Sequence, residues 1–406
     1  MLTGYNYDRP GARDRILGLY FHIPFCRSKC AYCDFYSFIP SGEEIMEHYV
    51  QTLLLHMQDY SDCAADCVCD TVYIGGGTPT VLPTELLVKL IRGIRKNFNF
   101  SANPEFTIEA NPATLTPDML KKLRRAGVNR LSIGLQSGDN RELRALSRIH
   151  TRADFEQSYR MAREAGFDNI SVDLMFGIPG ETVDSLMRNL RYVTRLGVEH
   201  ISLYNLKLEP GTPLFEHRSE LVLPDEDTEA DMYLRAVEYL NSEGYPQYEI
   251  SNFSLPGRQS RHNLKYWNCY EYLGFGPAAH SYFNDVRFSY TRNIEAYITG
   301  VENPTADVSI IDQSEEIPAR ERIGEYVMLR MRLARGVRFD DFRYRFGADF
   351  EELYGRKLLP YLRGGFVRKT DGGVCLTPKG MFVSNYILSD ILDFSNVGET
   401  MFNGVK

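Results

Sequence analysis

The first 210 residues alternate between short apolar runs and longer segments with helical periodicity. Six runs rich in β-forming residues predict strands, at Leu17–Ile23, Thr71–Ile74, Glu105–Glu109, Arg130–Leu135, Asn169–Leu174 and His200–Tyr204. The segments between them predict helices, at Glu43–Tyr60, Thr84–Asn97, Pro117–Ala126, Arg152–Ala165 and Thr182–Leu196. This alternation is typical of βα units around a parallel sheet. Six units fit a partial (β/α)6 barrel or an open doubly wound sheet, and both gather their chemistry at the carboxyl ends of the strands.

The pattern changes after Pro210, and we expect three domains. Residues 1–210 form the α/β core, and residues 211–315 form an aromatic-rich extension. Residues 316–406 form a small α+β domain of winged-helix-like type, with a helix at Ile317–Ala334 and a later strand pair at Phe366–Val367 and Val374–Leu376. The net charge of −8 argues against a nucleic-acid partner, because nucleic-acid binders carry a basic excess.

The chain carries no recognisable targeting segment. Its start, Met1 to Arg15, is polar and mixed in charge, unlike a signal peptide. No apolar run approaches the roughly 18 residues that a spanning helix needs. We therefore expect a cytoplasmic protein, in which the eight cysteines stay reduced and serve as ligands or core residues.

Three cysteines follow the first predicted strand, in the segment CRSKCAYC that contains Cys26, Cys30 and Cys33. These spacings let one loop wrap three thiolates around one centre. Three thiolates leave one iron of a [4Fe–4S] cube open, and the amino and carboxylate groups of S-adenosylmethionine (SAM) can chelate it. The alternative is zinc, because His22 could complete a Cys3His set. The spacing favours the cluster. A second group, Cys63, Cys67 and Cys69, has no supporting motif, and we interpret it as incidental.

Polar residues recur at the ends of the following strands. The second strand leads into Gly75-Gly76-Gly77-Thr78-Pro79, whose glycines let a ligand approach the backbone closely. The third strand ends at Glu109, the fourth near Gln136, and the fifth contains Asp173, while Arg148 is a candidate partner for a carboxylate. Each residue alone is explained as well by a structural hydrogen bond. Their recurrence at successive strand ends favours a ligand site.

Seven motifs span residues 20–180: YFHIPFC, CxxxCxYCDF, GGGTPT, IEANP, GLQS, SRIH and DLMFGIPG. In these motifs the chain resembles the radical SAM superfamily and, within it, the oxygen-independent coproporphyrinogen III oxidase-like family. The resemblance implies that the three cysteines ligate the cluster and that Tyr20, Gly76 and Glu109 contact SAM. It also places other residues around the SAM or substrate side of the pocket, and leaves a second SAM molecule open: Tyr32, Gly77, Thr78, Gln136, Arg148, Asp173 and, by spacing alone, Lys207.

Two departures from the oxidase pattern point to the HemW branch of that family. Phe35 stands where the oxidase pattern has a further cysteine, and only 25 residues precede Cys26. The segment His262-Asn-Leu-Lys-Tyr266-Trp267 matches the HNxxYW signature that the branch uses in haem binding. The resemblance therefore implies that His262, Tyr266 and Trp267 contact haem. A histidine beside aromatics is otherwise most often a core residue. His280 is a weaker candidate.

The resemblance thus implies a haem chaperone with a radical SAM core. The chain would bind haem as cargo and pass it to a recipient haem protein, at a membrane surface, and would form a homodimer. SAM cleavage and enzymatic turnover are left open. The alternatives are an enzyme that oxidatively decarboxylates coproporphyrinogen III and a zinc-stabilised binding protein without redox chemistry.

Overall fold

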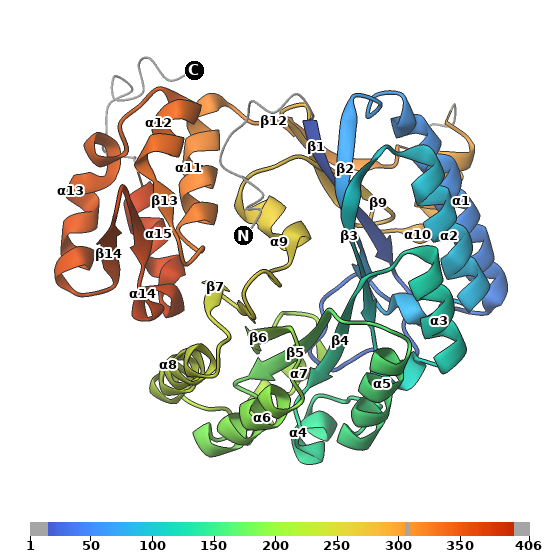
Figure 1. Cartoon of the computed structure of the whole chain (residues 1–406), viewed down its shortest axis with the longest axis horizontal. Helices are drawn as coiled ribbons and strands as arrows, with labels where there is room; N and C mark the ends of the chain where they lie inside the picture. The colour runs from blue at the N-terminus through green and yellow to red at the C-terminus, as the bar shows by residue number, and fades with distance from the viewer. Residues whose placement is uncertain (1–14, 305–308, 394–406) are drawn as a thin grey trace.

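A computed structural model describes residues 15–304 and 309–393 of the chain, which fold into a curved α/β core and a smaller α+β domain (Figure 1). Two segments discussed above lie outside the described residues: residues 1–14 at the polar start of the chain, and residues 394–406 of the predicted third domain. No described helix is long and apolar enough to cross a membrane.

The core contains six adjacent parallel strands in chain order, each pair aligned along its length. They are β1 (Arg15–Ile23), β2 (Cys67–Gly76), β3 (Phe100–Ala110), β4 (Arg130–Gln136), β5 (Ile170–Phe176) and β6 (His200–Asn205). The helices between them are α1 (Glu43–Ser61), α2 (Thr84–Asn97), α3 (Pro117–Ala126), α4 (Asn140–Ala145), α5 (Arg152–Glu164) and α6 (Val183–Arg195). These helices lie on the outer side of a curved sheet (Figure 1). The partial (β/α)6 barrel is therefore confirmed over the open doubly wound sheet.

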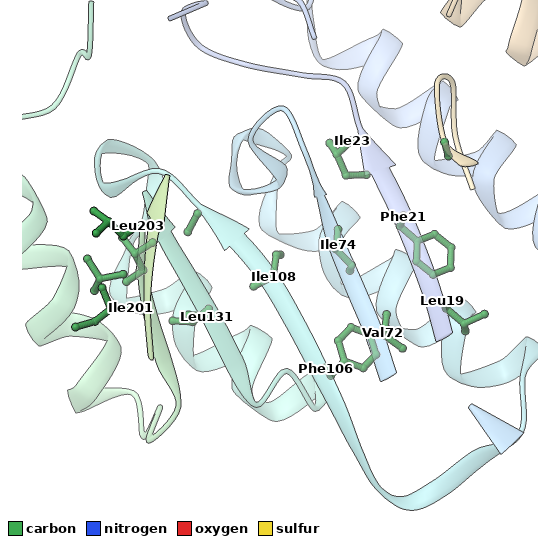
Figure 2. Close-up of a cluster of buried hydrophobic side chains, with 14 of the residues drawn as sticks. Leu19, Phe21, Ile23, Val72, Ile74, Phe106, Ile108, Leu131, Ile201 and Leu203 are labelled. Atoms are coloured by element: carbon green, nitrogen blue, oxygen red, sulfur yellow. The ribbon is translucent and has the colours of Figure 1, made fainter. Parts of the chain in front are cut away.

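Side chains alternate along the strands between two faces of this sheet. One set is apolar and buried, and Figure 2 shows part of it: Leu19, Phe21, Ile23, Val72, Ile74, Phe106, Ile108, Leu131, Ile201 and Leu203. The other set, inside the arc, is mostly polar: Tyr20, His22, Thr71, Tyr73, Glu105, Thr107, Glu109, Ser132, Ser171, Asp173, His200 and Ser202. This alternation turns one face toward the helices and leaves a polar interior for binding and chemistry.

The later strands extend both edges of the barrel to a sheet of twelve strands in the described chain, an extension that the sequence did not predict. Antiparallel β8 and β7 follow β6, and β9, β10, β11 and β12 extend the sheet beyond β1. These elements are α7 (Pro213–Glu216), α8 (Glu226–Ser242), β7 (Gln247–Glu249), β8 (Asn252–Ser254), α9 (Arg261–Trp267), β9 (Tyr272–Phe275), β10 (His280–Phe283), β11 (Val286–Tyr290), α10 (Ile294–Glu302) and β12 (Ile311–Glu316). Three short 3-10 turns cover Pro79–Val81, Pro112–Thr114 and Arg218–Glu220.

The short helix α9 fills the interior of the arc near the starts of the strands. Glu105 of β3 accepts hydrogen bonds from the backbone N–H groups of Arg261 and His262 at 3.0 and 2.9 Å. Lys265 is fully buried and pairs with Asp70 of β2 at 2.6 Å. Gly18 of β1 leaves room for this lysine, because a Cβ there would lie 2.7 Å from its Cδ. Helix α9 is therefore a plug in the open barrel.

The smaller domain combines five helices with a three-stranded sheet in the order β13-β15-β14. Its elements are α11 (Ala319–Arg330), β13 (Val337–Arg338), α12 (Phe339–Phe346), α13 (Phe350–Arg363), β14 (Val367–Thr370), β15 (Gly373–Leu376), α14 (Pro378–Phe382) and α15 (Ser384–Leu392). The predicted hairpin is confirmed as β14 and β15. The domain attaches to the plug through Asn268, whose side-chain oxygen accepts from Arg335 at 2.8 Å and from the buried Arg330.

The second cysteine group is divided between two elements. Cys67 and Cys69 are buried in β2, and Cys63 is exposed after α1. Burial raises the pKa of Cys67 to about 12, which keeps this thiol protonated. The incidental interpretation of the group fits these positions.

The Asp70–Lys265 pair generates a stability prediction. Asp70→Ala leaves a buried ammonium without its partner, so we expect the protein to lose about 3–5 kcal/mol of unfolding free energy. The exposed Glu85–Lys122 pair is the control, and Glu85→Ala should cost less than about 1 kcal/mol. Denaturant unfolding of both variants measures the difference, and equal losses would contradict the role of the plug.

Candidate cluster and nucleotide site

The three predicted cluster ligands lie on one loop that begins directly after β1. The loop is closed at its base by a bridge between Phe25 and Phe38. The N–H of Cys26 donates to the carbonyl of Phe38 at 2.9 Å, and the N–H of Phe38 donates to the carbonyl of Pro24 at 2.8 Å. Cys26 is buried, while Cys30 and Cys33 are half-buried. The closed base holds the thiols at the carboxyl end of the first strand.

The glycine segment after β2 packs against this loop. The N–H of Gly77 donates to the carbonyl of Ile23, and that of Thr78 donates to the carbonyl of Phe25, both at 2.8 Å. The hydroxyl of Thr78 lies 3.7 Å from the sulfur of Cys26. A Cβ on Gly77 would lie 2.7 Å from the Phe25 carbonyl oxygen and 3.0 Å from that sulfur. Residue 77 is therefore glycine because the cysteine loop occupies its side-chain space.

Arg148 connects the cysteine loop to the fourth strand. Its guanidinium donates to the sulfur of Cys30 at 3.2 Å and to the carbonyl of Gly134 at 2.9 Å. Tyr32 also interacts with this guanidinium. Gln136 ends β4 in the left-handed region, with φ of 68°, which turns the chain at the strand end. Arg148 thus joins the cysteine loop to the end of β4, two segments that are far apart in the sequence.

The donor set fits an iron–sulfur cluster. Burial raises the pKa of Cys33, and the neighbouring thiolates of Cys30 and Cys26 raise it further. A cationic cluster relieves this repulsion, and Arg148 offsets charge at Cys30. Thiolate sulfur is the ligand that such clusters use. Among the described residues, no group of three or more His, Cys, Asp or Glu side chains is placed to hold a single metal ion.

His22, the fourth ligand of the zinc alternative, is engaged elsewhere. Its Nδ1 lies 3.0 Å from the hydroxyl of Tyr20, and its Nε2 lies 2.8 Å from the carbonyl of Tyr36. Nε2 therefore donates to the carbonyl, and Nδ1 accepts from the tyrosine. Burial lowers the pKa of His22 to about 4, so the ring is neutral. With both nitrogens bonded, His22 does not complete a zinc site.

Glu109 lies at the end of β3 beside the glycine segment. One carboxyl oxygen accepts from the hydroxyl of Tyr73 at 2.8 Å, and the other accepts from the N–H of Gly76 at 3.1 Å. Burial raises the pKa of Glu109 to about 7, although these two hydrogen bonds oppose the rise. Tyr20 stacks on Tyr73 at 6.4 Å between ring centroids. The three residues predicted to contact SAM therefore share one corner of the interior.

Asp173 and Lys207 complete the predicted set. Asp173 of β5 accepts from the hydroxyl of Ser132 at 3.1 and 3.2 Å, and burial raises its pKa. Lys207 follows β6, is exposed, and acts electrostatically on Glu229. Asp173 belongs to the polar interior, whereas Lys207 lies at the rim.

The predicted haem residues lie on α9. The ring of His262 is fully buried, with Nδ1 2.9 Å from the hydroxyl of Thr71 and Nε2 2.8 Å from that of Tyr266. Burial lowers the pKa of His262 to about 3, and the charges of Lys265 and Arg130 lower it further. Trp267 is half-buried. Direct ligation of iron by His262 stays a prediction, and it requires that these hydrogen bonds give way.

A cavity of about 470 Å³ separates α9 from the cysteine loop. Its walls include Tyr20, His22, Phe35, Tyr266 and His280. Sequence reasoning missed further wall residues, among them Tyr36, Tyr272 and Arg292. Tyr36 directly follows the cysteine motif in the sequence, and this position could have identified it as a candidate wall residue. Arg292, which donates to the carbonyl of Asp34 at 3.4 Å, had no such signal.

The position of Gly77 generates a prediction about cluster assembly. Gly77→Ala places a methyl group against Phe25 and Cys26, so we expect reconstituted protein to hold less than half the wild-type iron and sulfide. Gly42→Ala is the matched control, because a Cβ at Gly42 meets nothing within 4 Å and its φ of 173° suits alanine. Iron and sulfide analysis measures both, and full occupancy in Gly77→Ala would contradict the tight contact.

Comparisons with known proteins agree with this site. The profile of the radical SAM superfamily matches residues 20–193, and that of the HemN C-terminal domain matches residues 317–383. The chain is 33% identical over 375 residues to the heme chaperone HemW of Lactococcus lactis, which covers 92% of this chain and 96% of that protein. It is 35% identical over 379 residues to the heme chaperone HemW of Bacillus subtilis, which covers 92% and 98%.

Among solved structures, coproporphyrinogen III oxidase HemN from Escherichia coli shares the fold. Its TM-score is 0.81 at 23% identity, over 94% of this chain and 92% of that chain. Membership of the radical SAM superfamily implies a [4Fe–4S] cluster and SAM as cofactors. On the cysteine loop, the matched domains and the full-length relatives, the chain belongs to the radical SAM superfamily and, within it, to the HemW family.

Proposed function

We propose that this protein is a haem chaperone that binds haem and delivers it to recipient haem proteins, with a radical SAM core as its scaffold. The observation that carries the proposal is the similarity, at 33–35% identity, to proteins named heme chaperone HemW along almost their whole length. The cysteine loop, the glycine segment and Glu109 support the radical SAM part, since they lie together at the carboxyl ends of neighbouring strands.

The residues of the cluster and nucleotide site have separate roles in this proposal. Cys26, Cys30 and Cys33 hold the cluster, and Arg148 balances charge at Cys30. Glu109 and the backbone of Gly76 orient the amino group of SAM. When bound, the cluster supplies an electron and SAM supplies a cleavable sulfonium bond.

Phe35 favours the chaperone over the oxidase. It stands two residues after Cys33, its side chain is 61% exposed, and it lines the cavity between the cysteine loop and α9. An apolar ring there provides contact surface, where the oxidase pattern has a thiol. The similarity to HemN is one of fold and does not transfer its reaction.

Haem would contact α9 through Tyr266 and Trp267, whose rings offer flat apolar faces. Tyr266 is the best placed of the three predicted haem residues, because it lines the cavity that faces the cluster loop. His262 bonds the hydroxyl of Tyr266 and so positions that ring. Delivery at a membrane surface and a homodimer stay predictions of the sequence.

The chaperone proposal is tested by adding haemin to the anaerobically reconstituted protein. We expect a stoichiometric absorption spectrum, weakened about tenfold in affinity by His262→Ala, and unchanged by substitution of the exposed His217 with alanine. His262→Gln separates two roles: an altered Soret band indicates an iron ligand, and an unaltered band indicates positioning. Wild-type protein that binds no haem, or that converts coproporphyrinogen III with SAM and reductant, would contradict the proposal.

The pKa of Glu109 generates a second prediction. At pH 6 the carboxyl is mostly protonated, because its pKa is about 7. An amino group of SAM that chelates iron would have lost its ammonium proton, and its N–H groups would favour the carboxylate form of Glu109. Binding should therefore lower the pKa of Glu109 and release a proton from this residue in addition to the one that SAM itself loses. Calorimetry of SAM binding in two buffers with different ionisation enthalpies should show the release in wild-type protein.

In Glu109→Gln the release should fall to the part that comes from SAM itself. The control is Glu181→Gln, which removes another carboxyl with a raised pKa, about 8 because of burial, whose partner is the backbone of Ile178. Proton release that is as large in Glu109→Gln as in wild-type protein would show that Glu109 does not contact the amino group of SAM.

A further inference from the structure

A second and larger cavity, of about 820 Å³, lies on the far side of Tyr266 from the cluster loop. One wall comes from the end of α9 and from β9 to β11, and the other comes from α11 and α12 of the smaller domain. Figure 1 shows α9 between the curved sheet and α11. The volume falls in the range of about 300–1,000 Å³ that is typical of small-molecule and cofactor sites, which often form where two domains meet.

Tyrosines dominate the walls of this cavity on both sides. In the described chain they are Tyr266, Tyr270, Tyr272 and Tyr282 from the core and Tyr326 and Tyr344 from the smaller domain. Tyrosine rings give broad apolar faces with a hydroxyl at one edge. Such walls suit a large flat aromatic molecule that also carries polar groups at its rim.

Three arginines and two carboxylates, those of Asp285 and Glu325, line the same cavity. Arg287 bonds Glu325 at 2.6 Å, Arg322 bonds Asp285 at 3.2 Å, and Arg345 bonds Asp341 at 3.1 Å. Arg287 and Arg322 are each about one-third exposed, and Asp285 is largely exposed. A guanidinium has five N–H donors, so each arginine keeps donors for a further carboxylate.

Two wall residues connect this cavity to the one beside the cluster loop. Tyr266 and Tyr272 line both cavities, and their rings meet edge to face with centroids 4.6 Å apart. The sulfur-containing side chains of Cys269 and Met328 also line the larger cavity. A ligand here is thus separated from the radical SAM site by one pair of tyrosine rings.

We propose that this cavity between the barrel and the smaller domain holds the haem cargo, with the porphyrin against the tyrosines and its carboxylates at Arg287 and Arg322. The inference rests on the proposed chaperone function, and it names the binding site. The smaller domain would then take part in haem binding, because α11 supplies Arg322 and Met328 to the site. Movement of this domain relative to α9 would then open the cavity toward a recipient.

The test compares haem affinities of purified, reconstituted variants. The double variant Arg287→Gln with Arg322→Gln should bind haem at least tenfold more weakly, because each lost charged hydrogen bond reduces affinity by about tenfold or more. The matched control is Arg343→Gln, since Arg343 lies on α12, pairs with a single aspartate and does not line the cavity. Haem dimethyl ester has no carboxylates, so the double variant should bind it as wild type does.

A cavity-filling variant gives an independent measurement. Met328→Trp places an indole in the space, so we expect it to weaken both haem and the dimethyl ester by at least tenfold. Iron content and SAM affinity should stay at wild-type values in every variant. If the double variant and Met328→Trp bind haem as tightly as wild type, the cavity assignment is wrong and the chaperone function stands. If wild-type protein binds no haem, the proposed function itself fails.

Discussion

The polar interior of an open barrel is the constraint on which this structure depends. Alternation along six parallel strands sends apolar side chains outward to the helices, so polar side chains must collect inside. Burying them without partners costs free energy. Helix α9 supplies partners, because its first N–H groups bond Glu105 and its Lys265 pairs with Asp70. The plug stabilises the same interior that leaves a binding site at the other end of the strands.

The two ends of the strands have therefore taken different roles. At the carboxyl end, the cysteine loop, Gly77 and Arg148 pack together, and Glu109 keeps a buried carboxyl beside them. At the amino end, His200 bonds Ser171 at 2.7 Å and Tyr248 at 2.8 Å, and His262 bonds Thr71. Burial keeps both histidines neutral. The predicted cofactor ligands thus gather at one end, while the other end is held together by the hydrogen bonds of neutral histidines and by the Lys265–Asp70 pair.

The smaller domain is tied to the plug through buried polar groups. Arg330 bonds Asn268 directly after α9, and Asp341 bonds Tyr326 and Arg345 within the domain. The tyrosine-lined cavity lies beside this junction. Any movement of the domain changes the cavity and the surroundings of Tyr266 together, which would couple cargo to the radical SAM site through Tyr266 and Tyr272.

Local pattern was sufficient for much of the fold and the cluster loop. All six core strands and five of their helices were predicted, two helices with the observed bounds, because hydrophobic period and turn residues are local signals. The six-residue helix α4 was not predicted, because it is too short to show a helical period of apolar residues. Cys26, Cys30 and Cys33 could be identified as candidate ligands because a single loop carries all three.

Tertiary structure decided what local pattern does not encode. The pairing of β9 with β1, the use of HNLKYW as a plug, and the cavity shared by β9, α9 and α11 all join segments distant in sequence. The sequence around His262 does not distinguish an iron ligand from a buried core residue. Only the positions of Thr71 and Tyr266 show that its two nitrogens are bonded, because burial and hydrogen bonding depend on which distant strands surround a side chain.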